Sequence, residues 1–134
     1  SGRPASVRSA PVKVYQQITM LPRDTNSYGT VFGGVIISYL DLAGAACCRD
    51  HFRNPRFTTR VVRELVFAHP VRVGDLLSLH GELVSAGTTS VTVRLQARAR
   101  SREDRQEVVV TEAEMVYVAV DAAGDKTPLV PWED

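Results

Sequence analysis

The stretch VFGGVIISYLDLAGAACC, residues 31–48, decides the fold of this chain. It is apolar almost all round and too long for one strand, and its Leu, Ala and Ile residues suit a fully buried helix. We place that helix from about Gly33 to about Arg49. Asp41, between two leucines, is the only charged side chain in the stretch, so its presence there needs a chemical or a structural reason.

Strand patterns lie on both sides of this helix. Alternating apolar residues between Val12 and Met20 predict a first strand with one buried face, and a loop rich in Pro, Asn, Ser and Gly follows at 21–30. Four further strand patterns come after the helix, and the third of them has the cleanest two-residue period: 57–67, 76–85, 90–100 and 108–120.

The order strand, helix, four strands leaves only the sheet to cover the apolar helix. It predicts an α+β fold, a single hotdog domain in which a long central helix is wrapped by a five- to six-stranded antiparallel sheet. At 134 residues the chain has room for one domain. We expect a flexible arm over 1–12, the domain over 13–130 and a tail over 131–134.

The overall composition excludes several classes of function. With 16 basic and 15 acidic side chains the net charge is +1, which gives no field to recruit nucleic acid or an anionic membrane. No stretch approaches the roughly 20 apolar residues of a membrane-spanning helix. Adjacent Cys47 and Cys48 do not suit a disulfide framework, so we expect reduced thiols and a cytoplasmic location. The three histidines lack ligand spacing, so we expect no metal.

Asp41 can be explained in two ways. An ionised carboxylate away from water is costly unless it is paired, so such a group is either held for chemistry or fixed by structural partners. A structural Asp41 would cap a turn or meet a partner chain, and Ser38 is placed to satisfy one of its oxygens. The helix by itself weighs the two explanations evenly.

The glycines at the start of the helix form a second candidate site. Gly33 and Gly34 lower helix propensity but let another group approach the backbone N–H donors, which attract negative charge. Such donors can hold the oxyanion of a tetrahedral intermediate, although a tight loop-to-helix turn explains the glycines equally well. Eight residues separate Gly33 from Asp41, about 12 Å along a helix axis. A shared reaction therefore requires a dimer, and Asn26 of the preceding loop is placed to join the oxyanion side or to position water.

The segment LPRDTNSYGTVFGGVIISYLDLAG, residues 21–44, resembles the hotdog acyl-CoA hydrolases of the YciA and cytosolic acyl-CoA thioesterase type. The resemblance covers roughly Val14 to Pro128. It continues through further motifs at 69–75, 87–91, 111–113 and 117–121.

This resemblance implies an acyl-CoA thioesterase that hydrolyses the thioester of a fatty or other acyl-CoA. The family's helix aspartate, here Asp41, acts as general base or nucleophile. Asn26, Gly33 and Gly34 of the neighbouring subunit form the oxyanion side, and Thr111 helps to line the site. CoA is part of the substrate and product, so no separate cofactor is implied. A homo-oligomer is expected, with a dimer as its minimal unit and a hexamer, a trimer of dimers, as its assembly.

The sequence departs from the family pattern at Arg63, where similar proteins often carry an acidic residue, and this puts the substrate preference in doubt. Arginines of two strand patterns are candidate partners for the phosphates of CoA: Arg60, Arg94, Arg98 and Arg100. For any single one of them a solvated strand face is the stronger alternative. Thr88 and Ser90 are candidate donors to the ligand, but a hairpin turn explains them equally well.

Other functions stay open as alternatives. A hotdog hydratase or dehydratase would use a histidine, yet none lies between Val31 and Cys48. A non-catalytic acyl-CoA-binding sensor would keep the fold alone, and the presence of both Asn26 and Asp41 argues against it. A serine hydrolase lacks its Gly-x-Ser-x-Gly elbow, and the cysteines lack an evident histidine partner.

Overall fold

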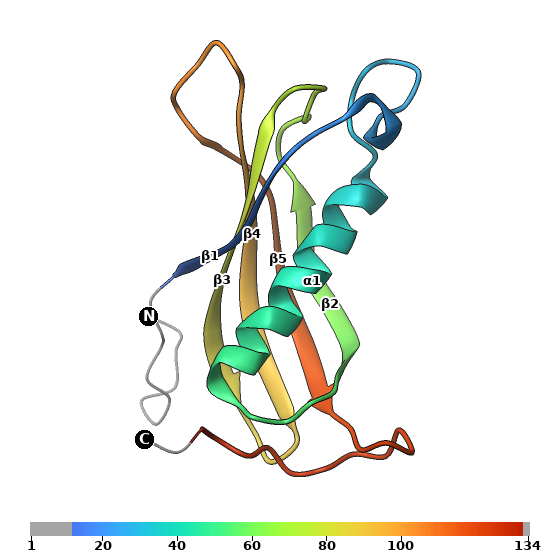
Figure 1. Ribbon diagram of the computed structural model, residues 1–134, viewed down its shortest axis with the longest axis vertical. Coiled ribbons are helices and arrows are strands. Elements are labelled where there is room, and N and C mark those ends of the chain that lie inside the picture. The colour runs from blue at the N-terminus through green and yellow to red at the C-terminus, as the bar shows by residue number, and fades with distance from the viewer. Residues whose placement is uncertain (1–11, 133–134) are drawn as a thin grey trace.

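The structure is a computed structural model that describes residues 12–132. One long helix and five strands make up most of the chain (Figure 1). In chain order the elements are β1 (Lys13–Thr19), the short 3-10 helix η1 (Pro22–Asp24), α1 (Gly33–His51), β2 (Phe57–Phe67), β3 (Leu76–Ala86), β4 (Ser90–Arg100) and β5 (Val108–Ala119). The predicted arm at 1–12 lies outside the described residues except for Val12, and Glu133 and Asp134 of the predicted tail lie outside them as well.

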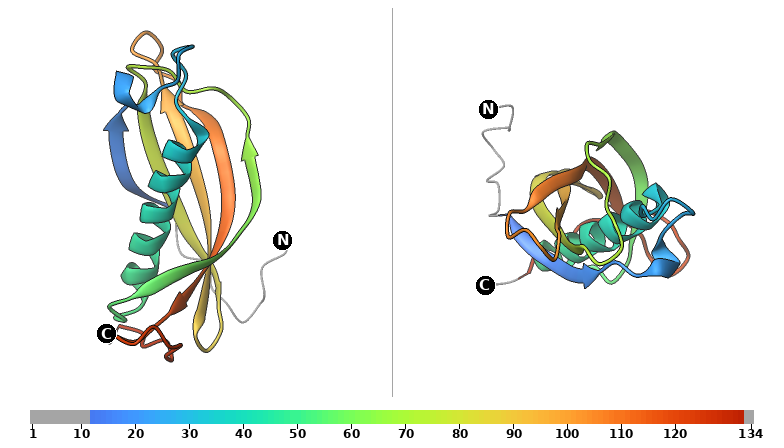
Figure 2. Two further views of the ribbon diagram at one scale, coloured as in Figure 1. Left: turned by 90° about the vertical axis from the view of Figure 1, so that its right-hand side faces the viewer. Right: turned by 90° about the horizontal axis from the view of Figure 1, so that it is seen from above.

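The five strands form one antiparallel sheet in the order β1-β3-β4-β5-β2. The sheet curves around α1, which lies along its concave side (Figure 2). This arrangement confirms the predicted α+β hotdog fold, with five strands. No helix among residues 12–132 is long and apolar enough to cross a membrane.

The core lies between one face of α1 and the inner face of the sheet. On β4 every second residue is buried, from Val91 to Ala99, as the two-residue period predicted. On α1 the buried residues recur at helical spacing: Ile36, Leu40, Ala43, Gly44, Cys47 and Cys48. The expectation of a fully buried helix is wrong for the single chain, because the sheet covers only one side and Leu42 stays 62% exposed.

The first strand also differs from its predicted pattern. A register shift between Val14 and Gln16 makes Tyr15 a bulge residue, so Val14 is 45% exposed while Tyr15 packs against the core. The Tyr15 hydroxyl donates to Asp50 Oδ2 at 2.8 Å and ties β1 to the end of α1. Because of the bulge, Tyr15 packs against the core in place of Val14, which the alternating pattern had predicted to be buried.

The edge strand β2 carries the strongest irregularities. Its pairing with β5 shifts between Thr59 and Val61 and again between Arg63 and Val66. Glu64, inside the second shift, has φ of 54°, a left-handed conformation that costs a residue with a Cβ atom about 1 kcal/mol or more. Most of this strand is exposed, and α1 lies beside it (Figure 1).

Candidate active site

Asp41 lies in the middle of α1, half-buried, with its side chain turned toward β2 and β5. Thr59 Oγ1 of β2 donates to Asp41 Oδ1 at 2.6 Å, and the Tyr117 hydroxyl of β5 is 2.9 Å from the same oxygen. Ser38, a candidate partner from the sequence, donates to the Gly34 carbonyl at 2.9 Å instead. The carboxylate is therefore held by the sheet and not by its own helix.

Tyr117 is the most deeply buried of these partners, with 1% of its surface exposed. Its hydroxyl also lies 2.7 Å from the carbonyl oxygen of Asp41. Burial, followed by the charge of Asp41, raises the pKa of Tyr117 well above its ordinary value, so its phenol stays protonated and available as a donor. The tyrosine and the carboxylate thus form one connected polar group beneath the helix.

The start of α1 presents free backbone donors. Phe32 is its N-cap, makes no side-chain capping bond, and no acidic residue lies in the first turn. Among the described residues, no backbone acceptor outside the helix takes the N–H groups of Gly33 or Gly34. A Cβ atom on Gly33 would lie 3.2 Å from the Phe67 ring, whereas one on Gly34 would meet nothing within 4 Å. Gly34 is also exposed, so this amide is open to a ligand.

Asn26 shapes the loop that leads into the helix. Its Oδ1 accepts from the backbone N–H groups of Tyr28 at 2.9 Å and Thr30 at 3.2 Å, and its Nδ2 donates to Thr30 Oγ1 at 2.8 Å. These bonds close the turn before α1, and one Nδ2 hydrogen is left over. The side chain can therefore both fix the loop and offer one donor.

A cleft of about 290 Å³ opens beside the helix start. It is lined by loop, helix and strand residues that include Gly33, Ile36, Phe67 and His69. Thr111 pairs in register with Phe67, but it is fully buried, and among residues 12–132 its Oγ1 has no hydrogen-bond partner. Thr111 thus lies beneath this region and does not open into the cleft.

The candidate residues fall into two groups within one chain. Asn26, Gly33 and Gly34 lie at the helix start, and Asp41 lies eight residues further on, about 12 Å along the axis. No hydrogen bond joins the two groups in the described part of the chain. A single carbonyl cannot contact both groups on the same helix.

Two further candidates lie where β3 connects to β4. Thr88 and Ser90 belong to the β3–β4 hairpin, where the Thr88 carbonyl accepts from Leu129 N–H at 2.8 Å and the Ser90 carbonyl from Gly87 N–H at 2.8 Å. The Gly87–Ser90 bond fits the hairpin explanation, whereas the Thr88 bond joins the turn to the segment that follows β5. No bond described for either residue reaches Asp41.

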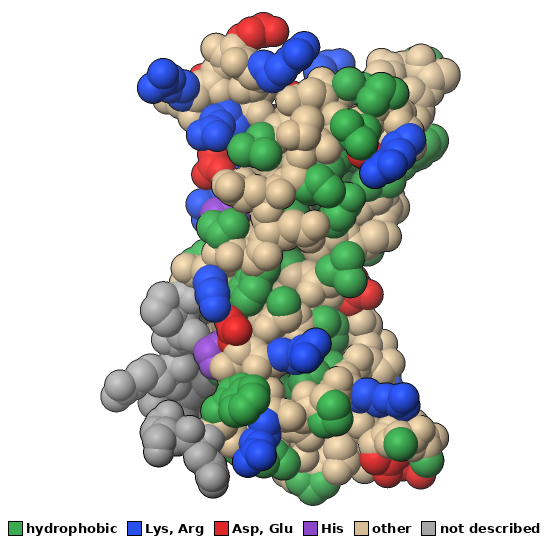
Figure 3. All heavy atoms as spheres, in the orientation of Figure 1, with side chains coloured by type: hydrophobic (Ala, Val, Ile, Leu, Met, Phe, Trp, Pro, Cys, Tyr) green, Lys and Arg blue, Asp and Glu red, His purple; other side chains and the backbone are tan. Residues whose placement is uncertain are grey.

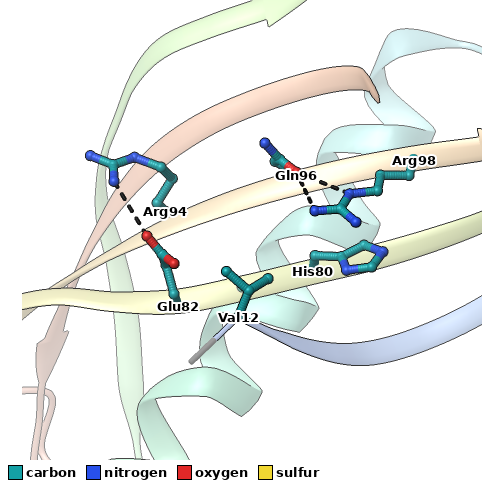
Figure 4. A pocket seen from close by; sticks show the side chains of 7 residues that line it. Val12, His80, Glu82, Arg94, Gln96 and Arg98 are labelled. Carbon is teal, nitrogen blue, oxygen red and sulfur yellow. Dashed lines mark hydrogen bonds and ion pairs between the residues drawn. The ribbon is translucent and has the colours of Figure 1, made fainter. Parts of the chain in front are cut away.

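The arginines are divided between two surfaces. Arg60 is exposed on the edge strand, directly after Thr59. Arg94 lies on the sheet face opposite the core, where it pairs with Glu82 at 3.4 Å and Glu114 at 3.5 Å (Figure 4). Arg98 lies on that same face and donates to Gln96. Of these three arginines, Arg60 is the one whose chain neighbour, Thr59, contacts Asp41.

The sequence did not indicate Thr59 as a site residue. It included Tyr117 only as part of the family motif at 117–121. Thr59 and Tyr117 are register partners across β2 and β5. Their relation to Asp41 depends on that pairing. The one available signal was the tyrosine in the otherwise apolar stretch 115–120, since a buried phenol needs a hydrogen-bond partner.

Comparison with known proteins places these features in a family. The family model described as "Thioesterase superfamily" matches residues 28–106. The acyl-CoA thioester hydrolase YciA of Salmonella typhimurium is 35% identical over 112 residues, 81% of this chain and 84% of the relative. YciA of Escherichia coli K12 is 36% identical over 107 residues, 78% of this chain and 80% of the relative.

A solved structure agrees with the sequence matches. The hexameric thioesterase y2039 from Yersinia pestis superposes with a TM-score of 0.82 at 31% identity, covering 87% of this chain and 94% of that one. The resemblance to the YciA-type hydrolases is thereby confirmed. From its fold, its sequence relatives and its structural neighbour, this chain belongs to the thioesterase superfamily and has the hotdog fold.

Proposed function

We propose that this protein is an acyl-CoA thioesterase that hydrolyses acyl-CoA to the free acid and CoA. The observation that carries the proposal is Asp41, the one charged side chain between residues 31 and 48, held by two sheet hydroxyls in a half-buried position. The relatives named acyl-CoA thioester hydrolases support the substrate class. Thioester hydrolysis also needs hydrogen-bond donors for the carbonyl oxygen, and the backbone N–H groups at the start of α1 can supply them.

The proposed reaction uses each group once. The thioester oxygen accepts from the N–H groups near Gly33 and Gly34, which makes the carbonyl carbon more electrophilic. In the first route Asp41 takes a proton from water as the water oxygen bonds to that carbon. In the second route Asp41 attacks the carbon directly, and water then hydrolyses the mixed anhydride. In both routes the carbon–sulfur bond breaks and sulfur leaves with the electron pair as CoA thiolate, which takes up a proton.

We propose that each site combines two subunits, the helix start of one and Asp41 of the other. The 12 Å separation along α1 supports this, since about 3 Å is the reach of a hydrogen bond. The exposed edge strand offers the surface for pairing, with Val61 at 40%, Val62 at 42% and Val66 at 55% exposure. Apolar groups are also exposed on the side of the molecule where α1 lies (Figure 3). The y2039 thioesterase is hexameric, and we propose the same trimer of dimers here.

Sedimentation tests the two-subunit proposal. The wild-type chain is expected to sediment as a hexamer, or at least as a dimer, at micromolar concentration. Val62→Lys introduces a charge on the edge strand and is expected to weaken the assembly and the activity together. A wild-type chain that hydrolyses acyl-CoA as a monomer would rule out the shared site.

Arg60 is the arginine that we expect to meet a CoA phosphate, because it is exposed on the edge strand directly after Thr59, which contacts Asp41. Arg94 would have to serve a site of another subunit, since it lies on the opposite sheet face and already pairs with two glutamates. Arg60→Gln should raise KM with little change in kcat, and Arg94→Gln should not. A raised KM in Arg94→Gln but not in Arg60→Gln would assign the phosphate contact to Arg94 instead.

Thiol release is the direct test of the activity. Wild-type protein and Asp41→Asn are compared on short, medium and long acyl-CoAs, with equal assembly of the two proteins shown by sedimentation. We expect release by wild type and loss of nearly all of it in Asp41→Asn, which keeps the shape and removes the charge. Tight CoA binding with no release at any chain length would support the sensor function instead.

A further inference from the structure

The two oxygens of the Asp41 carboxylate have different surroundings. Oδ1 is bonded by Thr59 Oγ1 at 2.6 Å and by the Tyr117 hydroxyl at 2.9 Å. Within residues 12–132 no hydrogen bond reaches Oδ2. Two hydroxyls therefore approach Oδ1, whereas the lone-pair sites of Oδ2 stay open among the described residues.

Tyr117 reaches this oxygen only because residue 44 is glycine. A Cβ atom on Gly44 would lie 2.1 Å from the Tyr117 hydroxyl oxygen and 2.6 Å from its ring carbon Cζ. Gly44 is buried inside α1, three residues after Asp41, at a helix position where glycine is unfavourable. The glycine that weakens the helix is thus the one that admits the tyrosine.

The register of the sheet brings the second hydroxyl to the same place. Thr59 and Tyr117 are directly paired residues on β2 and β5. Both side chains point toward α1, and their hydroxyls meet the carboxylate from the sheet side. The Tyr117 hydroxyl also has the Asp41 carbonyl oxygen at 2.7 Å and Met115 Sδ at 3.4 Å, so its two nearest acceptors belong to Asp41. Backbone and side chain of Asp41 are fixed together.

We infer that Tyr117, admitted by Gly44, acts with Thr59 as a positioning residue that holds Oδ1 of Asp41 and leaves Oδ2 as the oxygen that reacts. This inference rests on the proposed thioesterase function. It applies to both routes, because Oδ2 is then the atom that takes the proton from water or attacks the thioester carbon. Without the two hydroxyls the carboxylate can rotate, and displacement of a catalytic group by about 1 Å can lower a rate on the order of 100-fold.

The test separates positioning from folding by comparing two tyrosine hydroxyls. Tyr117→Phe is expected to lower kcat roughly 10- to 100-fold, with KM and the affinity for CoA within about threefold of wild type. Tyr15→Phe is the matched control, because it removes a hydroxyl that also donates to an aspartate, Asp50, at 2.8 Å. Its kcat should equal that of wild type.

A second pair of variants tests the same oxygen from the edge strand. Thr59→Val removes the hydroxyl and keeps the shape, whereas Thr59→Ser keeps the hydroxyl. We expect loss of kcat in the first and near wild-type kcat in the second. Because both bonds hold one oxygen, the double variant Tyr117→Phe with Thr59→Val should lose much less than the product of the two single losses.

The outcomes distinguish this inference from the proposed function. If Asp41→Asn is inactive while Tyr117→Phe keeps kcat within twofold, the positioning role is wrong and the thioesterase function stands. If Tyr117→Phe does not fold, equal kcat in Thr59→Val and Thr59→Ser likewise shows that the positioning role is wrong. A wild-type protein that releases no thiol from any acyl-CoA overturns both.

Discussion

The substitution Gly44→Ala should reduce activity far more than it reduces stability. The new Cβ atom would lie 2.1 Å from the Tyr117 hydroxyl, so the ring must retreat by about 1 Å or more before the two atoms reach ordinary contact. Overpacking of a core costs about 1–3 kcal/mol, and the gain in helix propensity from Gly to Ala returns about 1 kcal/mol. We expect a net loss of about 1 kcal/mol in the free energy of unfolding and a fall of roughly 10- to 100-fold in kcat.

Urea unfolding and thiol release on the same preparations, at one protein concentration, measure the two effects. Ala46→Gly is the matched control, because it lowers helix propensity by about 1 kcal/mol at a position that no described bond links to Tyr117. It should lose similar stability and keep its kcat. Wild-type kcat in Gly44→Ala, or an equal loss of kcat in Ala46→Gly, would refute the reasoning that couples Gly44 to Asp41 through Tyr117.

Three single residues outside the Asp41 contacts allow separate tests. Glu64→Gly should raise the free energy of unfolding by about 0.5–1 kcal/mol in urea, because glycine relieves the left-handed backbone at φ of 54°. Burial and then the charge of Arg98 lower the pKa of His80, so the unfolded chain takes up the proton first and stability should fall as pH drops below about 6.5. Urea unfolding of wild type and His80→Gln above and below pH 6.5 tests this. An equal change in the free energy of unfolding between the two pH values in both proteins would contradict it. His69→Gln, in the cleft beside Gly33, should keep thioester hydrolysis within a few-fold; its inactivity would favour histidine-dependent chemistry.

The elements of this fold could be predicted because their patterns are local. The strand at 90–100 alternates buried and exposed residues along its length, and the observed β4 has the predicted bounds. The helix was predicted from its apolar content and ends at His51, two residues beyond the predicted end. Bulges depend on how neighbouring strands pair, so the one at Tyr15 was not predicted.

The candidate site could be predicted only in part for the same reason. Asp41 and the helix glycines stand out against their neighbours in the chain, and the helical rise alone gives their separation. Thr59 and Tyr117 are 58 residues apart, and they become partners of Asp41 only when β2 pairs with β5 in one register. The need for glycine at position 44 comes from the close approach of Tyr117, and no spacing in the sequence indicates that contact.

The most direct test of the shared site is activity in mixed oligomers of two inactive variants. One variant is Asp41→Asn, and the other is Gly34→Pro, which removes an N–H group at the helix start. The control is Gly34→Ala, which keeps the N–H group and adds a Cβ atom that meets nothing within 4 Å. With random mixing at equal amounts, half of the dimers are heterodimers and each has one intact site, so about a quarter of wild-type activity should return. Mixed oligomers, verified by affinity tags, that stay as inactive as either variant would contradict a site built from the helix start of one subunit and Asp41 of the other.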